Sequence, residues 1–119
     1  MGLFDSFLGA EKRALAKASK NLEKVDALQK SGSKVEALAL LEQTGAMLGE
    51  TLKDVKKAKR EFSGTFAELG SRYLALDKGQ AALDAAHVSL QLDQGNTRAM
   101  GIAGRASLRL GKNEDAISW

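Results

Sequence analysis

The chain has 119 residues and a net charge of +3, and it contains neither cysteine nor proline. Its length favours a single domain, and the absence of cysteine excludes disulfides and thiolate metal sites. No apolar run approaches the roughly 20 residues that cross a bilayer, and the N-terminus lacks the pattern of a secretory signal. We therefore expect a soluble cytoplasmic protein, and a charge this small does not by itself indicate a nucleic-acid partner.

Strong helix formers dominate the composition and predict an all-α domain over residues 1–119. The first helix is predicted over about residues 5–30, and it ends at Ser31-Gly32-Ser33. The second opens at Ser33, with Glu36 in the capping-box position. Its apolar stripe continues to Phe62 in alternating steps of three and four residues. The short connection predicts that residues 1–62 form a long antiparallel helical hairpin.

Four further helices are predicted after this hairpin. The third opens at Thr65 and ends near Leu76, and the fourth follows Asp77, with Gln80 in the reciprocal capping position. The fifth runs from about Thr97 to Leu110 and is expected to stop at Gly111, a residue that favours helix C-termini. The sixth begins near Asn113. Two glycines inside the fifth helix are interpreted as close-packing positions, namely Gly101 and Gly104.

Residues 63–119 carry a recurring pattern of aromatic, glycine and small side chains. One predicted helix shows Phe66, Leu69, Gly70 and Tyr73, and the next shows Ala82, Ala86 and Ser89. The turn Leu92-Asp93-Gln94-Gly95-Asn96 follows, and Ala116 lies 34 residues after Ala82. This pattern strongly resembles the tetratricopeptide repeat (TPR), a helix–turn–helix unit of about 34 residues. Phe66 stands where the family has tryptophan, and Gln94 stands where it has the turn proline.

The resemblance divides the chain into three parts. Residues 63–96 form one repeat, residues 97–119 form a partial repeat, and residues 18–51 within the hairpin form a degenerate one. The family implies stacked helix pairs in which the first helix of each pair lines a concave, partner-binding face. Small side chains at the crossings would let the paired helices approach closely.

No catalytic or metal-binding constellation is visible in the sequence. His87 is the only histidine, and the acidic residues do not form a compact ligand cluster. We therefore expect no enzymatic activity, no cofactor and no metal.

Three arginines are the best candidates for partner binding. The spacing of Arg98, Arg105 and Arg109 places them on one face of the fifth predicted helix, and no acidic residue occurs between Thr97 and Lys112. Guanidinium groups bind carboxylates in a bidentate fashion, so an acidic peptide is the natural ligand. Ser71 and Ala67 on the preceding unit depart from the carboxylate clamp of some family members.

An apolar cluster at the N-terminus is a second, weaker candidate for a contact surface. It consists of Leu3, Phe4, Phe7 and Leu8 at helical spacing. The cluster suits packing onto the second helix or onto a sister chain, and less readily a membrane interface.

Together these patterns predict a protein–protein interaction scaffold of TPR type that binds a partner peptide or helix. The alternatives are a structural homo-oligomer and a peripheral membrane-surface protein. The predicted sixth helix is too short to cover the fifth, so we expect either a longer repeat protein or self-association.

Overall fold

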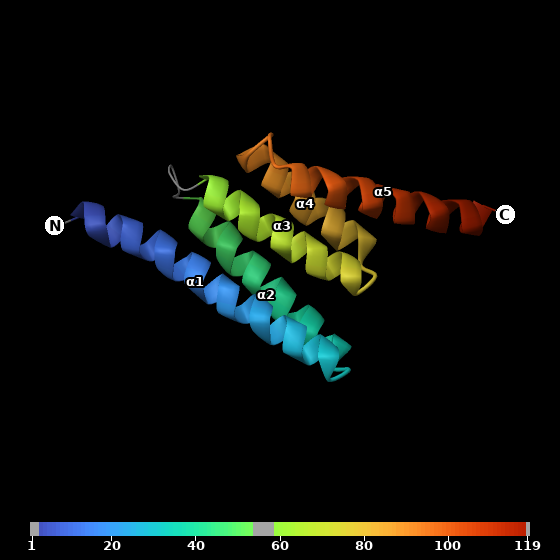
Figure 1. Ribbon diagram of the computed structural model, residues 1–119, viewed down its shortest axis with the longest axis horizontal. Coiled ribbons are helices and arrows are strands. Elements are labelled where there is room, and N and C mark those ends of the chain that lie inside the picture. The colour runs from blue at the N-terminus through green and yellow to red at the C-terminus, as the bar shows by residue number, and fades with distance from the viewer. Residues whose placement is uncertain (1–2, 54–58, 119) are drawn as a thin grey trace.

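The computed structural model describes the backbone of residues 3–53 and 59–118, and the side chains of Gly9, 11–53 and 59–111. The helices in this part of the chain are α1 (Leu3–Lys30), α2 (Lys34–Leu52), α3 (Lys59–Ala75), α4 (Gly79–Leu92) and α5 (Thr97–Ser118) (Figure 1). The prediction of an all-helical chain is confirmed for these residues.

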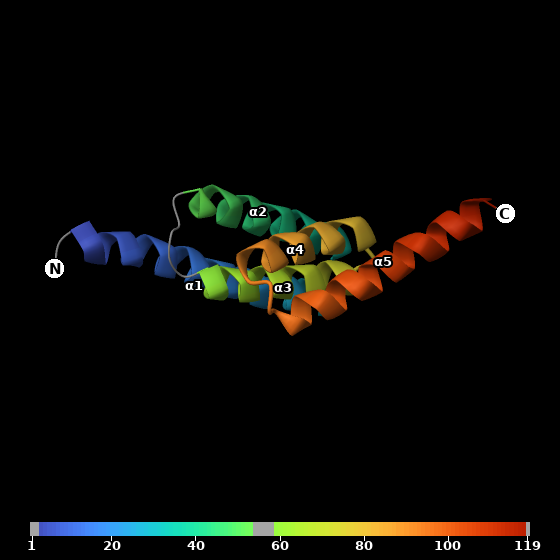
Figure 2. The same ribbon diagram turned by 90° about the horizontal axis from the view of Figure 1, so that it is seen from above.

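The helices are stacked in two layers. Each helix packs against the next one in the chain, and α3 also contacts both α1 and α5. Within the described ranges, α2 and α4 do not contact each other. Seen from above, α2 and α4 form one layer, while α1, α3 and the first half of α5 form the other (Figure 2). The result is an elongated molecule of 62 × 33 × 19 Å.

Helix α3 is the centre of the hydrophobic core, because it contacts all four of the other helices. Its apolar residues recur every three or four positions, which directs them to one broad face. The buried members of that face are Phe62, Phe66, Leu69, Tyr73 and Leu74. Small residues of α4 cover them, namely Ala82, Ala85, Ala86 and Ser89. Ala82, which the repeat pattern places at a helix crossing, is fully buried, with an exposed fraction of 0%.

Two of the turns share one geometry. After α1, Gly32 adopts a left-handed backbone with φ of +83°, and after α3, Asp77 does so with φ of +63°. In each case the next amide donates back to a carbonyl five residues earlier, at 2.8 Å after α1 and 2.9 Å after α3. This is the Schellman motif, which satisfies carbonyls at the end of a helix. It reverses the chain within three residues and makes the paired helices antiparallel.

A buried polar cluster joins α3, α4 and the start of α5. The hydroxyl of Ser63 donates to the Ser89 carbonyl at 2.8 Å, and the hydroxyl of Ser89 donates to the Ser63 carbonyl at 2.7 Å. The Asn96 amide then donates to both hydroxyl oxygens, at 3.0 and 3.2 Å. Its own oxygen accepts from the Ala99 amide at 3.0 Å, so Asn96 is also the N-cap of α5.

The predicted extent of the second helix is wrong. Helix α2 ends at Leu52, and Phe62 belongs to α3, which begins at Lys59. The apolar stripe continues from one helix into the next, and periodicity carries no information about where the chain reverses direction. Val55 of the predicted stripe lies outside the described residues.

The predicted start of the second helix is confirmed, because Ser33 is the N-cap of α2, although its side chain makes no capping hydrogen bond. The predicted starts of the next two helices need correction. Thr65 lies inside α3, where its hydroxyl donates to the Glu61 carbonyl. Asp77 does not cap α4, since it occupies the left-handed position after α3 instead, and Gln80 donates to Asp84.

The predicted stop at Gly111 is wrong as well, because α5 continues as one helix to Ser118. No described atom lies within 4 Å of a Cβ placed at Gly111. A glycine costs a helix interior about 1 kcal/mol but ends it only when other contacts favour a turn. The side chains of residues 112–119, including Ala116, lie outside the description.

Candidate functional site

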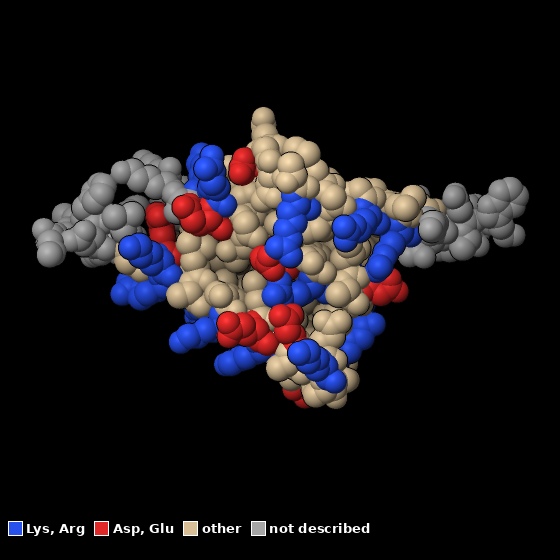
Figure 3. Space-filling model, viewed as in Figure 1, with Lys and Arg blue, Asp and Glu red and all other residues tan. Residues whose placement is uncertain are grey.

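The layer formed by α1, α3 and α5 presents a face on which both charge signs are interspersed (Figure 3). A continuous ionic network crosses this face. Arg72 of α3 donates to both carboxylate oxygens of Asp26 on α1, at 3.1 Å each, and it also pairs with Glu68 one turn earlier. Glu68 in turn pairs with Arg98 of α5. The network therefore connects three helices that are far apart in the sequence.

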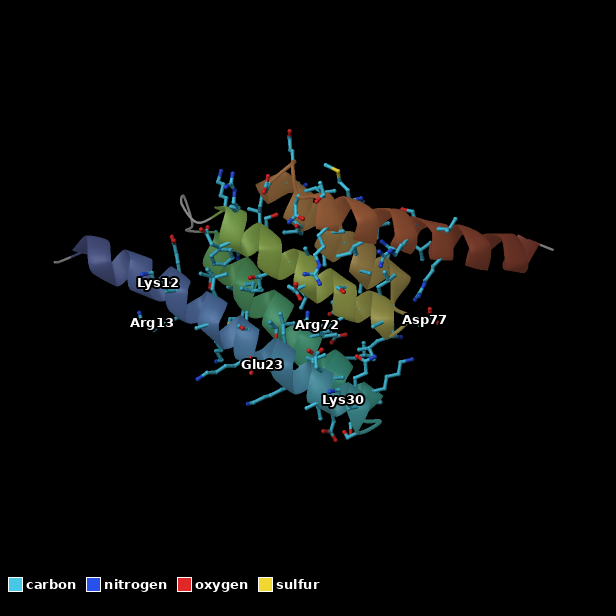
Figure 4. All side chains as sticks on the ribbon, in the orientation of Figure 1. Lys12, Arg13, Glu23, Lys30, Arg72 and Asp77 are labelled. Atoms are coloured by element: carbon cyan, nitrogen blue, oxygen red, sulfur yellow. The ribbon has the colours of Figure 1, made fainter. Side chains whose placement is uncertain are left out.

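Arg72 is the best-buried member of the network, with 19% of its side chain exposed. It lies between α1 and α3 (Figure 4). Burial alone would lower the pKa of Arg72, but the hydrogen bonds to Glu68 and Asp26 outweigh it, and the pKa is raised. The guanidinium is therefore a permanently charged structural tie between the hairpin and the rest of the molecule.

Arg109 closes the far end of the same face. Its guanidinium donates to the Leu74 carbonyl at 2.6 Å and to the Asp77 carboxylate at 3.2 Å. Both acceptors belong to the C-terminal end of α3, where a cation is favoured by the helix dipole. Asp77 lies at this end of α3, beside α5 (Figure 4).

The three arginines predicted to bind a partner therefore differ in their surroundings. Arg98 and Arg109 are engaged within the chain, although 58% and 46% of their side chains remain exposed. Arg105 is exposed and makes no ion pair within the described residues. Sequence reasoning missed Asp26 and Glu68 as partners, because nothing in their spacing relates them to α5. The Glu68–Arg72 pair, four residues apart on one helix, was the available signal.

The outer face of α5 is apolar and uncovered in the described structure. Met100 is 48% exposed and Leu108 is 61% exposed. Gly101 and Gly104 lie on the same face, and no described atom comes within 4 Å of a Cβ placed on either glycine. The interpretation of these two glycines as close-packing positions therefore finds no support within the described residues. We call this surface the open face of α5.

The open face of α5 corresponds to a buried face of α3, and at the Gly70 position that face is contacted by both α4 and α5. A shift of 34 residues relates Gly104 to Gly70 and Leu108 to Leu74. On α3 these positions are buried, and a Cβ added at Gly70 would lie 3.3 Å from the Ala82 carbonyl oxygen of α4. The same pattern of residues is thus covered by a helix in one place and exposed in the other.

A shallow groove runs along the contact between α3 and α4. Its floor contains the only tyrosine of the chain, Tyr73, and its charged residue is Asp84. Burial raises the pKa of the Tyr73 hydroxyl, and the nearby Glu42 raises it further. The remaining lining residues are apolar, namely Phe66, Leu69, Ala81, Ala85 and Val88.

The side chains of Leu3, Phe4, Phe7 and Leu8 lie outside the described residues, so the N-terminal cluster stays a prediction. Within the described ranges, no group of three or more histidine or acidic side chains is arranged to hold a metal ion. None of the helices described is both long and apolar enough to span a membrane.

Apolar and basic side chains therefore lie next to each other on the exposed part of α5. Comparisons of the chain with protein-family models, with curated proteins and with solved structures find no match.

Proposed function

We propose that this protein is a protein–protein interaction scaffold of TPR type, and that it is not an enzyme. Two features support the proposal. The helices are stacked in order, with α1, α3 and α5 in one layer and α2 and α4 in the other. The 34-residue correspondence between α3 and α5 has the period of that repeat.

The observation that carries the proposal is the open face of α5. Leu108 and Met100 are two of the three large apolar side chains that are exposed in the described structure. They lie on one face of a single helix, with glycines between them, rather than scattered singly over the surface. Exposed apolar side chains gathered on one helix face are typical of interaction sites.

Charge beside the open face favours an acidic partner. Arg98, Arg105 and Arg109 lie between this face and the core, and α5 has no acidic residue from Thr97 to Gly111. Arg105 is the arginine without an ion pair among the described side chains. Guanidinium groups in such a position pair with carboxylates across an interface and increase the rate of association. We therefore keep the acidic peptide or helix as the proposed ligand class.

The test compares two exposed apolar residues on different helices. Affinity-tagged full chain carrying Leu108→Glu should lose a specific partner from an extract of the native host, because a charge on the open face opposes its burial. Val35→Glu is the matched control, since Val35 is 82% exposed on α2. A partner that both variants retain equally would contradict the proposal.

Sedimentation equilibrium separates a foreign partner from a second copy of this chain. A homo-oligomer built through α5 would dissociate with Leu108→Glu and persist with Val35→Glu. A monomer at all concentrations, combined with loss of the captured partner in Leu108→Glu, would favour the scaffold over the homo-oligomer.

A further inference from the structure

The contact between α3 and α4 indicates what kind of helix could pack on the open face of α5. At its centre, Gly70 has no side chain, and an added Cβ would lie 3.3 Å from the Ala82 carbonyl oxygen and 3.5 Å from the Ala85 Cβ of α4, and also 3.3 Å from the Ile102 side chain of α5. The two backbones therefore approach closely. Every residue of α4 that is buried in this region is alanine or serine. A close crossing of this kind tolerates only small side chains on the covering helix.

The open face of α5 repeats this template with equal or smaller residues. Gly104 takes the place of Gly70, Gly101 takes the place of Ala67, and Leu108 takes the place of Leu74. A covering helix would find at least as much room on α5 as α4 finds on α3. Met100 replaces Phe66, and its flexible side chain adapts to the surface that packs on it.

The open face of α5 is not used by the hydrophobic core. The buried side of α5 consists of Ala99, Ile102 and Ala106, which lie on the opposite side of the helix from Gly101, Gly104 and Leu108. Covering the open face therefore requires no rearrangement of the helices already present. Helix α3 contacts all four of the other helices, whereas α5 contacts α3 and α4 among the described elements, so α5 repeats the pattern of α3 with fewer helices around it.

We infer that the open face of α5 binds an amphipathic helix whose contact face carries alanine and serine at the spacing found in α4. The inference rests on the proposed function and specifies the chemistry of the partner. The contact positions of α4 are Ala82, Ala85, Ala86 and Ser89, with steps of three, one and three residues. The bound helix would lie on α5 as α4 lies on α3, with an alanine opposite Gly104.

The experiment uses the α4 sequence itself as the probe. The full chain is extended by a Gly/Ser linker of about 20 residues, which spans roughly 25 Å, and then by a copy of residues 79–92. The chain has no cysteine, so within one molecule Gly104→Cys can form a disulfide only with one cysteine placed in the copy. In the template, the corresponding Cβ positions are 3.5 Å apart, which is within the range of about 3.5–4.5 Å seen in disulfides.

We expect a cysteine at the copy's Ala85 position to form the disulfide at least about ten times faster than one at its His87 position. His87 is exposed on α4 and faces away from α3, so it is the matched control for the effect of tethering alone. Equal rates for the two positions, or no disulfide with either, would overturn the inference.

Thermal unfolding of the extended chain without cysteines gives an independent measurement. The copy should raise the melting temperature, and Gly104→Leu should abolish that increase because it fills the crossing. No increase would overturn the inference. The proposed function would still stand if Leu108→Glu, but not Val35→Glu, lost a partner from the native extract. If the melting temperature did not rise and Leu108→Glu also kept the partner, the result would contradict the proposed function as well.

Discussion

The α1–α2 hairpin and the α3–α4 pair reverse the chain in the same way and pack their helices differently. When their turns are aligned on Gly32 and Asp77, which are 45 residues apart, Val25 of the hairpin takes the place of Gly70. Both positions are buried. One crossing is therefore filled by a branched side chain, while the other brings two backbones together. Backbone hydrogen bonds determine the turn, whereas side-chain volume determines how closely the two helices pack.

The same alignment separates two kinds of buried polar contact. Thr44 takes the place of Ser89, and Ala18 takes the place of Ser63. The hairpin therefore lacks the reciprocal serine pair, and Thr44 accepts a single hydrogen bond from Asn21 at 3.2 Å. The α3–α5 region joins three helices through Ser63, Ser89 and Asn96, whereas the hairpin joins two. We therefore expect the removal of a polar side chain to lower the free energy of unfolding more in the α3–α5 region than in the hairpin.

The largest expected difference concerns the two asparagines. Asn96→Ala removes two partly buried hydrogen bonds and the N-cap of α5, and it should lower the free energy of unfolding by about 2–3 kcal/mol. Asn21→Ala removes one partly buried hydrogen bond and should cost about 1 kcal/mol. Urea unfolding measures both values. Equal losses would mean that the cluster at α3, α4 and α5 contributes no more than the single bond of the hairpin.

Removing the tie between the two regions should have the next largest effect. Arg72→Met leaves Asp26 and Glu68 without their shared partner, and it should cost about 2 kcal/mol. Lys53→Met is the control, because the Lys53–Glu50 pair is exposed and contributes at most about 0.5 kcal/mol. A broader or biphasic thermal transition in Arg72→Met would indicate that the hairpin unfolds separately. A loss no larger than that of the control would contradict the structural role of Arg72.

Substitution by alanine should destabilise the protein at one glycine and stabilise it at another. Gly70→Ala places a methyl group 3.3 Å from a backbone oxygen that cannot move aside, and it should cost about 1–2 kcal/mol. Gly49→Ala lies on α2 with no described atom within 4 Å, and it should stabilise by up to about 1 kcal/mol through helix propensity. Chemical denaturation of both variants checks the sign, and stabilisation by Gly70→Ala would show that the α3–α4 crossing is looser than described.

Substitutions at Gly32 and Asp77, the left-handed positions of the two equivalent turns, should change the stability in opposite directions. Asp77→Gly relieves a left-handed backbone that disfavours side chains, and it should stabilise by about 0.5–1 kcal/mol after the loss of the exposed contact to Arg109. Gly32→Asp should destabilise by a similar amount. Melting temperatures of the two variants that moved in the same direction would contradict the equivalence of the turns.

The smallest expected effect on stability comes from Tyr73 and occurs only at alkaline pH. The pKa of Tyr73 is raised in the folded state, so the neutral hydroxyl stabilises the fold fully below the unfolded pKa of about 10. That contribution is lost as the pH rises through the folded pKa. Tyr73→Phe should therefore lose less stability than the parent chain above pH of about 10. Absorbance near the tyrosinate band reports the titration directly, since Tyr73 is the only tyrosine. An identical pKa in the folded and urea-unfolded chain would contradict the burial of this hydroxyl.

Much of the local structure was predictable because its determinants are local. The end of α1 at Lys30 follows from Gly32, and the start of α5 at Thr97 follows from the turn around Asn96. The position of Ala82 at a buried helix crossing was implied by the resemblance to the tetratricopeptide repeat. The break between α2 and α3 was not predictable in this way, because the same apolar periodicity continues through it.

The arginine site shows the same limit. Their spacing places Arg98, Arg105 and Arg109 on one face of α5. Spacing alone treats the three arginines as equivalent, although their surroundings in the structure differ. Which of them are paired depends on Glu68, Leu74 and Asp77 of α3, which lie 30 to 35 residues away along the chain. Helical periodicity describes one helix at a time and cannot include such partners.

By itself, the sequence determined that the chain is helical, which residues of each helix are apolar, that α1 ends before Gly32 and that α5 starts after Asn96. These properties depend on backbone conformation and on side chains within about one helical turn. Only the tertiary structure decided that Asp77 takes the left-handed position, that Arg72 ties α1 to α3, and that α3 is covered while the matching face of α5 is open. Those outcomes depend on which helices become neighbours, and the packing of side chains across three or more helices selects that arrangement.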